Sequence, residues 1–276
     1  MSPEILEIGC RSVLNRSRIP GIDYTVNPYT GCLHGCLYCY AQHMRSARSV
    51  AKSWGHFCHV KINAASRFRK QILTARPGLI SLSTATDPYQ SVEKKYRLTR
   101  QILCTLKPLR FSVSILTKSD LILRDQEILR QLTPDRCEIG FSLNTCDDAT
   151  AHLFEPGAPS PSRRIRAMQT LHAAGIRTWL FVAPVLPFFT PDTIESLFAS
   201  VRGSVDYIQV DRFNTKHGTD RRMAPLIQSR FPDLFTPWLN ILQNPKTRHA
   251  YYHEIFSQIG ALGKQMDMDV RFCGQS

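Results

Sequence analysis

Short apolar runs rich in β-branched residues alternate along this chain with longer stretches of helical spacing. In the helical stretches, apolar residues recur three and four positions apart, as Ile194, Leu197 and Val201 do. The pattern predicts strands over 59–63, 78–84, 111–117, 137–143, 177–185 and 206–213, and helices over 64–75, 92–107, 121–132, 162–174 and 192–201. Alternation of this kind predicts parallel strands joined by right-handed crossovers.

Both a doubly wound sheet and a full or partial (β/α) barrel fit this alternation, so the pattern leaves the architecture open. Polar side chains follow the apolar core of several strands, at 84–87, 117–119, 142–145 and 211–212. A barrel places its active site at the carboxyl ends of its strands, and an open sheet places it in a crevice beside those ends. Either architecture therefore directs these polar residues toward one site.

The last part of the chain breaks this rhythm. Helical stretches over 224–231 and 251–266 precede a strand-like run over 269–274. We interpret residues 220–276 as a C-terminal helical cap of the same domain. Residues 1–219 then form the core, together with an N-terminal lead-in and the cysteine-rich loop described below.

The composition allows one sizeable domain with a basic surface. The chain has 276 residues, 43% of them hydrophobic, which is enough for a real core. Its 35 Lys and Arg exceed its 22 Asp and Glu, and the net charge of +13 is spread along the whole chain. This balance fits a basic protein without a polyanionic partner as well as one that binds phosphate-bearing partners.

The cysteine content points to a reducing compartment. Nine cysteines are an odd number, and the first residues lack the pattern of a secretory leader. No apolar stretch approaches the ~20 residues that a membrane span needs. We therefore expect a cytoplasmic protein without a membrane partner, in which clustered thiols bind metal or perform chemistry.

Three cysteines gather in the stretch TGCLHGCLYCYAQHM, as Cys32, Cys36 and Cys39. Three thiolates can hold a zinc ion with one open position, a structural zinc ion with a fourth ligand such as His43, or an iron-sulfur cluster with one iron not bound by protein. Structural zinc usually takes its ligands from two separated knuckles. Three cysteines on one tight loop, with Gly35 inside it, suit a cluster better, and inert buried thiols are the least favoured reading.

This cysteine spacing, with Tyr38 before the last cysteine, resembles the signature of the radical S-adenosylmethionine enzymes. Further stretches resemble the spore photoproduct lyase-like, or DNA-repair photolyase-like, branch of that superfamily: NPYTGCLHGCLYCYA, VKIN, TDPYQSVEKKYRLTR, ILTKS and FEPGAPSPSRR. The resemblance covers about residues 10–215. It implies a partial (β/α)6 TIM-type barrel, in which 1–219 is the radical S-adenosylmethionine core.

The resemblance also implies cofactors and a reaction. In this superfamily three cysteines bind a 4Fe-4S cluster, and S-adenosylmethionine chelates the fourth iron. One electron cleaves S-adenosylmethionine to methionine and a 5′-deoxyadenosyl radical, which abstracts a hydrogen atom from the substrate. An electron donor such as flavodoxin or ferredoxin is therefore an implied partner, whereas the oligomeric state is not indicated.

Individual roles follow from the matching positions. The implied cluster ligands are Cys32, Cys36 and Cys39, and Tyr38 between them is expected to cover the cluster edge and meet the cofactor. The residues implied to contact S-adenosylmethionine are Thr86, Asp87, Lys118, Ser142 and Asn144. Because Asp87 precedes a proline, starting a helical turn is an alternative role for its carboxylate.

Position 84 departs from the pattern of spore photoproduct lyase. There the corresponding segment carries a cysteine that donates a hydrogen atom to the repaired thymine, and here the residue is Thr84. A hydroxyl hydrogen is far harder to abstract than a thiol hydrogen, so we do not expect reversal of the photoproduct. Tyr40 resembles the tyrosine that relays hydrogen in that enzyme, and Cys273 or Cys146 is a candidate to replace the missing donor.

Nucleic acid is the substrate class that the resemblance implies. Basic residues after the cysteine loop and on the expected helix 162–174 give weaker support: Arg45, Arg48, Lys52, Arg163, Arg164 and Arg166. A peptide or a small metabolite is the alternative substrate for a radical enzyme. The alternative of a different class is a zinc-binding, non-catalytic nucleic-acid module.

Overall fold

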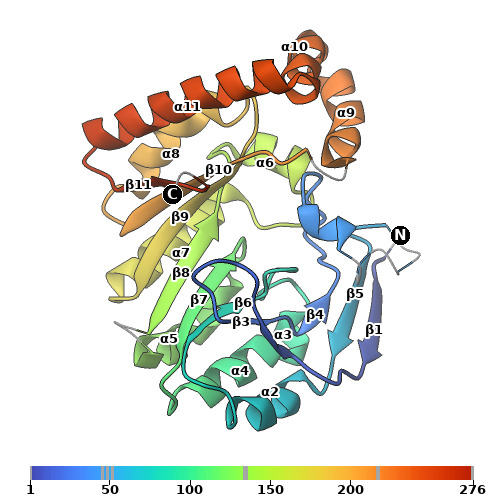
Figure 1. The fold of residues 1–276 in the computed structure, drawn as a ribbon, viewed down its shortest axis with the longest axis vertical. Coiled ribbons are helices and arrows are strands. Elements are labelled where there is room, and N and C mark those ends of the chain that lie inside the picture. Colours follow the sequence, from blue (N-terminus) through green and yellow to red (C-terminus); the bar gives the residue numbers. More distant parts are fainter. Residues whose placement is uncertain are drawn as a thin grey trace.

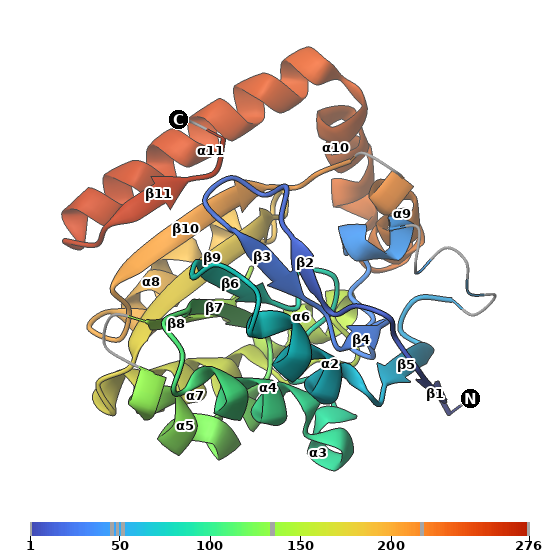
Figure 2. The same cartoon turned by 60° about the horizontal axis from the view of Figure 1, so that its bottom comes forward.

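A parallel sheet with helices packed on its outer side forms the body of the molecule (Figures 1 and 2). The computed structural model describes residues 2–44, 47, 50, 53–132, 136–215 and 218–274. Within the described part of the chain, the main sheet has eight strands in the order β11-β10-β9-β8-β7-β6-β3-β2. All neighbouring pairs are parallel except β2 with β3.

The strands of this sheet are β2 (Leu14–Arg16), β3 (Tyr24–Val26), β6 (Leu79–Leu82), β7 (Ser112–Thr117), β8 (Cys137–Ser142), β9 (Arg177–Val185), β10 (Tyr207–Arg212) and β11 (Val270–Phe272). Five of the six strands predicted from the pattern are β6 to β10. The predicted α/β class with a parallel, barrel-type sheet is confirmed.

The first strand of the prediction was assigned to the wrong sheet. Residues 59–63 fall in β5 (Phe57–Lys61), which pairs with β1 (Glu4–Ile8) and β4 (Tyr29–Thr30) in a separate three-stranded sheet. The place beside β6 belongs to β3, which has only three residues and therefore gives no recognisable alternation. The apolar pattern marks a segment as a strand but does not identify its partner.

The predicted helices are found among the described ones, two of them interrupted, whereas α6 and α10 were not predicted. The described helices are α2 (Ala64–Ile72), α3 (Glu93–Tyr96), α4 (Leu98–Leu106), α5 (Gln126–Leu132), α6 (Asp148–Phe154), α7 (Pro161–Ala173), α8 (Ile194–Val201), α9 (Thr219–Arg230), α10 (Pro232–Gln243) and α11 (Pro245–Gln265), with 3₁₀ helices η1 (Tyr40–His43), η2 (Asp120–Asp125) and η3 (Pro191–Thr193). The predicted helix 92–107 is split because Arg97 takes a left-handed conformation with φ of 52°. The start of the predicted helix 121–132 is the 3₁₀ turn η2.

Buried and half-buried side chains alternate along β7, and this alternation fixes where the strand ends. In β7, Val113, Ile115 and Thr117 are buried, and the residues between them are half-buried. Burying each large apolar side chain contributes roughly 1.5–3 kcal/mol, so the register of this strand is strongly held. That register carries Thr117, and Lys118 after it, to the carboxyl end of the sheet.

The C-terminal segment packs on the same core. Trp238, Ile241 and Tyr252 from α10 and α11 belong to one cluster of buried residues with the strands of the main sheet. The segment also adds β11 to the sheet edge beside β10. The boundary at 219/220 stays a prediction. None of the described helices is both long enough and apolar enough to span a membrane.

Candidate active site

The cysteine-rich loop runs from the end of β4 to the start of η1. Cys32 and Cys36 are each 7% exposed, and Cys39 is half-buried. The loop is tightly folded, because Gly35 N donates to Cys32 O and Cys39 N donates to Cys36 O. The thiols lie close enough to influence one another: burial raises the pKa of Cys32, and Asp87, Cys36 and Cys39 raise it further. The structure thus brings the three predicted ligands together.

Gln90 fixes the first half of this loop. Its side chain is fully buried, accepts a hydrogen bond from Leu33 N at 3.0 Å and donates one to Gly31 O at 3.1 Å. Since Gln90 follows β6 in the stretch TDPYQ, it ties the cysteine loop to the carboxyl end of that strand. Both backbone groups that it contacts would otherwise lack partners in a buried place.

The turn after α6 fixes the second half of the loop. Gly157 N donates to His34 O at 3.0 Å, and Leu37 N donates to Phe154 O at 2.9 Å. A Cβ on Gly157 would lie 2.1 Å from the Leu33 carbonyl oxygen, so only glycine fits there. The cysteine loop is therefore held by two distant segments of the chain through backbone contacts.

A buried ionic network lies behind the cysteines. The Glu155 carboxylate, 1% exposed, pairs with Arg164 and accepts a hydrogen bond from the Tyr38 hydroxyl. Lys118 Nζ lies 3.8 Å from the same carboxylate and 5.7 Å from the centre of the Tyr38 ring. Burial raises the pKa of Glu155, and the Arg164 guanidinium partly offsets this effect. The network links the predicted Tyr38 and Lys118 through Glu155, which the sequence did not single out.

Arg164 is the residue that the structure places differently from the prediction. It was expected on an electropositive rim for nucleic acid, but it is 1% exposed and bonded to Glu155, Pro159 O and Ser142 O. Arg164 lies on the same helix face as buried Ala167 (i+3) and Met168 (i+4), so its side chain turns toward the sheet. Arg163 remains on the surface in a pair with Asp120. Arg166 is also exposed, whereas the predicted Arg45, Arg48 and Lys52 lie outside the described residues.

Lys118 and Ser142 meet at the ends of neighbouring strands. Lys118 Nζ donates to Ser142 Oγ at 2.6 Å, and Ser142 Oγ donates to Ala183 O at 3.3 Å. Burial lowers the pKa of Lys118, while the nearby Cys36 raises it. The ends of β7, β8 and β9 are thereby joined beside the cysteine loop.

Asp87 braces the ends of β6 and β7. Its Oδ1 accepts from Tyr89 N and Thr117 Oγ1, both at 2.8 Å, and its Oδ2 accepts from Lys118 N at 2.7 Å. His34 Nδ1 lies 3.5 Å from Oδ2. Burial lowers the pKa of His34 to about 4, against the opposing effect of the Asp87 carboxylate. The contacts give Asp87 the turn-forming role that its position before a proline had suggested as the alternative.

Two predicted cofactor residues carry polar atoms with no partner among the described residues. Thr86 Oγ1 and Asn144 Nδ2 are both buried, and Asn144 is 2% exposed. Thr86 follows β6 and Asn144 follows β8, so they lie on either side of Lys118, which follows β7. A buried polar group without a partner costs roughly 1–3 kcal/mol, so each is suited to a ligand that supplies the missing hydrogen bond. These atoms fit a polar cofactor such as S-adenosylmethionine.

The predicted relay tyrosine lies against the position of the missing donor. Tyr40 is 55% exposed, and its hydroxyl donates to Thr84 O at 2.6 Å. Cys273 lies beside β10, since its backbone N donates to Val210 O at 2.9 Å. Cys146 Sγ is 3.8 Å from Thr193 O.

The geometry of the cysteines bears on the kind of metal centre. Across the part of the chain that is described, no three His, Cys, Asp or Glu side chains converge as ligands of one metal ion. In a four-iron cluster each cysteine binds a different iron, so the sulfur atoms stand apart. Cys32, Cys36 and Cys39 supply three soft thiolates on one tight loop, which is the donor set that such a cluster takes.

Gln90 and Glu155 are the supporting residues that sequence reasoning missed, whereas Arg164 was named but given a surface role. Gln90 and Glu155 are polar residues that are 0% and 1% exposed. The sequence feature that could have identified them is their position in TDPYQ and FEPGAPSPSRR, two of the stretches that carry the resemblance. That signal marks them as special but does not reveal their partners.

Comparison with known families and sequences gives a consistent result. The model of the radical SAM superfamily matches residues 26–201. An uncharacterized protein of Methanocaldococcus jannaschii is 29% identical over 256 residues, covering 93% of each chain. A radical SAM Nalpha-GlyT isomerase of Pseudomonas phage M6 is 27% identical over 228 residues, which is 76% of this chain and 45% of the phage protein.

Solved structures share the fold at low sequence identity. A mutant of spore photoproduct lyase superposes with a TM-score of 0.69 at 15% identity, covering 97% of this chain and 81% of the other. Streptococcus suis SuiB bound to S-adenosylmethionine superposes with a TM-score of 0.58 at 14% identity, covering 98% of this chain and 47% of that one.

Proposed function

Because the chain belongs to the radical S-adenosylmethionine superfamily, we propose that it is a radical enzyme whose cluster ligands are Cys32, Cys36 and Cys39. The family uses a 4Fe-4S cluster and S-adenosylmethionine. The observation that carries the proposal is the meeting of the cysteine loop with the polar ends of β6, β7 and β8. Soft thiolates on one side and hydrogen-bonding groups on the other suit these two cofactors.

The proposed cofactor contacts use the strand ends. Thr86 Oγ1 and Asn144 Nδ2 offer unpaired hydrogen-bonding capacity for the polar groups of S-adenosylmethionine. Lys118 supplies a cation for its carboxylate, and Ser142 orients that cation. Asp87 acts by holding the Lys118 backbone in place.

When bound, the cluster supplies the electron for reductive cleavage of S-adenosylmethionine. The protein's own residues position the reactants: Glu155 holds the Tyr38 hydroxyl and lies beside the Lys118 ammonium. Tyr38 is buried between two ligand positions, so its ring would border a bound cluster. A flavodoxin or ferredoxin is the proposed class of electron donor.

We propose a nucleic acid as the substrate, processed in a spore photoproduct lyase-like manner. Structural neighbours include a mutant of spore photoproduct lyase with dinucleoside spore photoproduct, and the net charge of +13 is compatible with a polyanionic substrate. By resemblance, Thr84 occupies the position of the lyase's hydrogen donor, and Tyr40 contacts it there, so this position offers no thiol. The proposed reaction therefore ends with a different hydrogen donor, for which Cys273 and Cys146 are the candidates in this chain.

A peptide substrate is the second candidate. The observation that favours it is the similarity to SuiB, which has been solved bound to the precursor peptide SuiA. The two candidates differ in salt dependence, because binding to a phosphate backbone releases counterions and weakens steeply as salt increases.

The first experiment measures the cofactors and the cleavage reaction together. The protein is purified and reconstituted without oxygen, and iron, sulfide and zinc are measured with 5′-deoxyadenosine formed from S-adenosylmethionine under dithionite. A variant with Cys32, Cys36 and Cys39 all changed to alanine is compared with Cys104→Ala, which changes an exposed cysteine away from the loop. We expect about four irons per chain and 5′-deoxyadenosine formation that only the triple variant abolishes.

The substrate class is tested by measuring the same product, 5′-deoxyadenosine. Single-stranded and double-stranded DNA, RNA and a peptide pool are added separately at low and high salt. Stimulation of 5′-deoxyadenosine formation by a nucleic acid, lost at high salt, supports the proposal, whereas salt-insensitive stimulation by peptides supports the second candidate. Stoichiometric zinc without S-adenosylmethionine cleavage contradicts the radical enzyme itself.

A further inference from the structure

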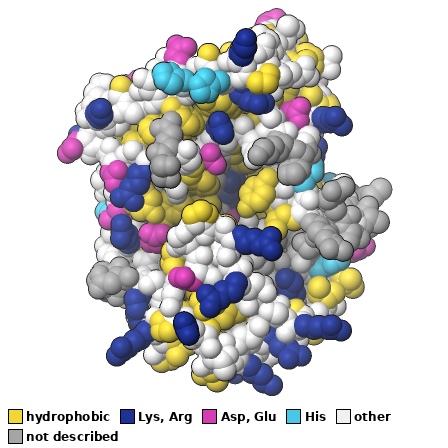
Figure 3. Space-filling model, in the orientation of Figure 1, with side chains coloured by type: hydrophobic (Ala, Val, Ile, Leu, Met, Phe, Trp, Pro, Cys, Tyr) yellow, Lys and Arg dark blue, Asp and Glu magenta, His cyan; other side chains and the backbone are white. Residues whose placement is uncertain are grey.

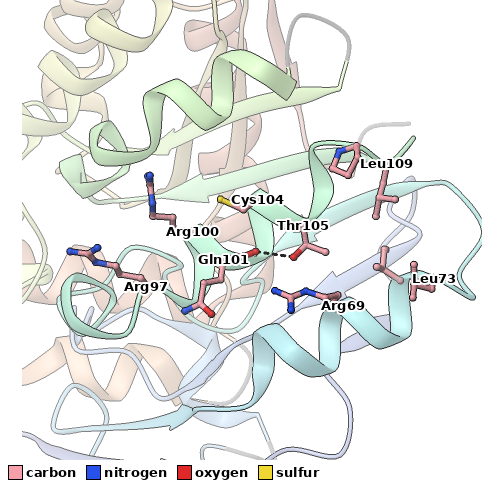
Figure 4. Close-up of a pocket in the computed structure, with 10 residues that line it drawn as sticks. Arg69, Leu73, Arg97, Arg100, Gln101, Cys104, Thr105 and Leu109 are labelled. Carbon is pink, nitrogen blue, oxygen red and sulfur yellow. Dashed lines mark hydrogen bonds between the residues drawn. The ribbon is translucent and has the colours of Figure 1, made fainter.

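A cavity of about 560 Å³ lies between α2 and α4 (Figure 4). We call it the α2–α4 groove; its walls are the end of α2, the length of α4 and the turn that precedes β7. None of the residues that line it belongs to the candidate active site. Its volume is in the range of a specific binding site, so its chemistry deserves an explanation separate from the cysteine loop.

One end of the groove is cationic. Arg69 comes from α2, and Arg97 and Arg100 come from the start of α4 (Figure 4). Arg100 is already paired with Asp125 at 2.7 Å. No ion pair in the described structure involves Arg69 or Arg97, both of which are exposed. Two guanidinium groups are therefore available to an anion.

Positive charge predominates around the groove, where Asp125 is the carboxylate paired with Arg100. Residues 61–86 and 94–119, which contain α2 and α4, carry twelve Lys and Arg and no Asp or Glu. Figure 3 shows Lys and Arg side chains over the lower part of the molecule, where Figure 1 places α2 and α4. Charge of one sign around a concave surface raises the local concentration of oppositely charged partners.

The other end of the groove is apolar. Leu73 is 74% exposed and lies on the same side as Leu109, away from Arg97 and Arg100 (Figure 4). Together with Pro108 and Leu109, Leu73 gives this end of the groove an apolar wall, against which an aliphatic side chain of a protein partner can pack. No aromatic side chain lines the groove, so it offers no platform on which a nucleobase could stack.

We propose that the α2–α4 groove docks an acidic segment of a partner protein that carries an aliphatic side chain next to its carboxylates. Carboxylates bind guanidinium groups in a bidentate manner, which suits Arg69 and Arg97. The aliphatic side chain covers Leu73. A phosphate backbone would satisfy the arginines but would bring charged oxygens against Leu73. This surface is separate from the cysteine loop, and the inference does not depend on the proposed reaction.

The test uses a short fluorescein-labelled peptide of alternating Glu and Leu, measured by fluorescence anisotropy at physiological salt. We expect Arg69→Glu with Arg97→Glu to weaken binding at least about tenfold, or roughly 1.4 kcal/mol. The matched control is Arg202→Glu with Arg230→Glu, which changes the net charge equally at exposed sites elsewhere and should leave binding within about twofold. Leu73→Ser should also weaken binding, and a Gln-Leu peptide should not bind.

A second measurement needs no substitution. Cys104 lines the groove and is exposed, so the peptide should slow its alkylation by a maleimide, followed by mass spectrometry of the Cys104 peptide. Equal weakening by the two arginine pairs, or unchanged alkylation of Cys104 under saturating peptide, would overturn the proposal. So would a DNA duplex that competes for the groove while the peptide does not, since that result assigns the groove to phosphate.

Discussion

Replacing Glu155 by glutamine tests whether the buried network supports the candidate site. Glu155 and Arg164 are each 1% exposed, and the Tyr38 hydroxyl donates to the same carboxylate. Glutamine keeps nearly the same shape and one acceptor oxygen but removes the negative charge. The Arg164 guanidinium would then be left in the interior without a counter-ion, and Lys118 would lose the anion 3.8 Å away.

The magnitude follows from the burial of the pair. Removing one partner of a buried ion pair costs about 3–5 kcal/mol, and we expect the lower end, about 3 kcal/mol, because glutamine still accepts a hydrogen bond. For a large domain each kcal/mol lowers the melting temperature by roughly 2–4 °C, so the expected decrease is about 6–12 °C. The free energy of unfolding of such a domain is only about 5–15 kcal/mol, which makes the loss easy to measure.

The assay is denaturant and thermal unfolding under anaerobic conditions. The matched control is Asp269→Asn, which removes the carboxylate of an exposed arginine pair with 53% and 50% exposed side chains. Exposed pairs contribute about 0–1 kcal/mol, so this control should unfold almost like the wild type. If Glu155→Gln changed the free energy of unfolding no more than Asp269→Asn does, the buried network would not have the role described here.

Three further changes test other parts of the structure. Gly157→Ala should reduce the iron bound per chain after reconstitution, because the new Cβ would lie 2.1 Å from a carbonyl oxygen of the cysteine loop; normal iron content would contradict the close contact. Asp147→Ala should cost about 1 kcal/mol at neutral pH, because Asp147 Oδ2 caps α6 by accepting from Thr150 N. Hydrogen bonds from Thr150 lower the pKa of Asp147, so its stabilising contribution is fully present at pH values above the ordinary pKa of 3.8 and is lost as the pH falls through the lowered pKa. A difference in the free energy of unfolding between variant and wild type that persisted in acid would refute this role. Arg222→Gln should lower the reduction potential of the reconstituted cluster, because the positive Arg222 guanidinium lies near Cys36 and Cys39. The potential is measured by potentiometric titration, with Arg230→Gln at the far end of the same helix as the control. Equal potentials in the two variants would show that Arg222 has no such effect.

The sequence predicted the elements whose apolar pattern is long enough to read. Strand β7 alternates over six residues and was predicted to within one residue at its start. Strand β3 has three residues, too few for a period, and its role beside β6 was missed. The break between α3 and α4 was missed because it depends on the left-handed conformation of Arg97, which no residue type at that position signals.

The candidate site was predicted in part for a similar reason. The cysteine spacing is local, so the sequence indicated the loop and the chemistry it suits. The contact of Tyr38 with Glu155 joins residues 117 positions apart, and no periodic pattern reports such a contact. Arg164 was assigned to the surface because charge alone does not distinguish a solvated arginine from one paired in the interior.

The way in which the cysteine loop is held has a consequence for how the metal centre is assembled. Gln90 and the backbone of Gly157 fix this loop through contacts that involve no metal. Ordering the eight residues from Cys32 to Cys39 costs on the order of 10 kcal/mol of conformational entropy, and these protein contacts offset part of that cost. In small zinc domains, by contrast, metal binding and folding are one event, and chelators unfold them. This chain should instead survive the loss of its cluster as a folded apoprotein, so that oxidative damage to the cluster can be repaired by reloading rather than by new synthesis.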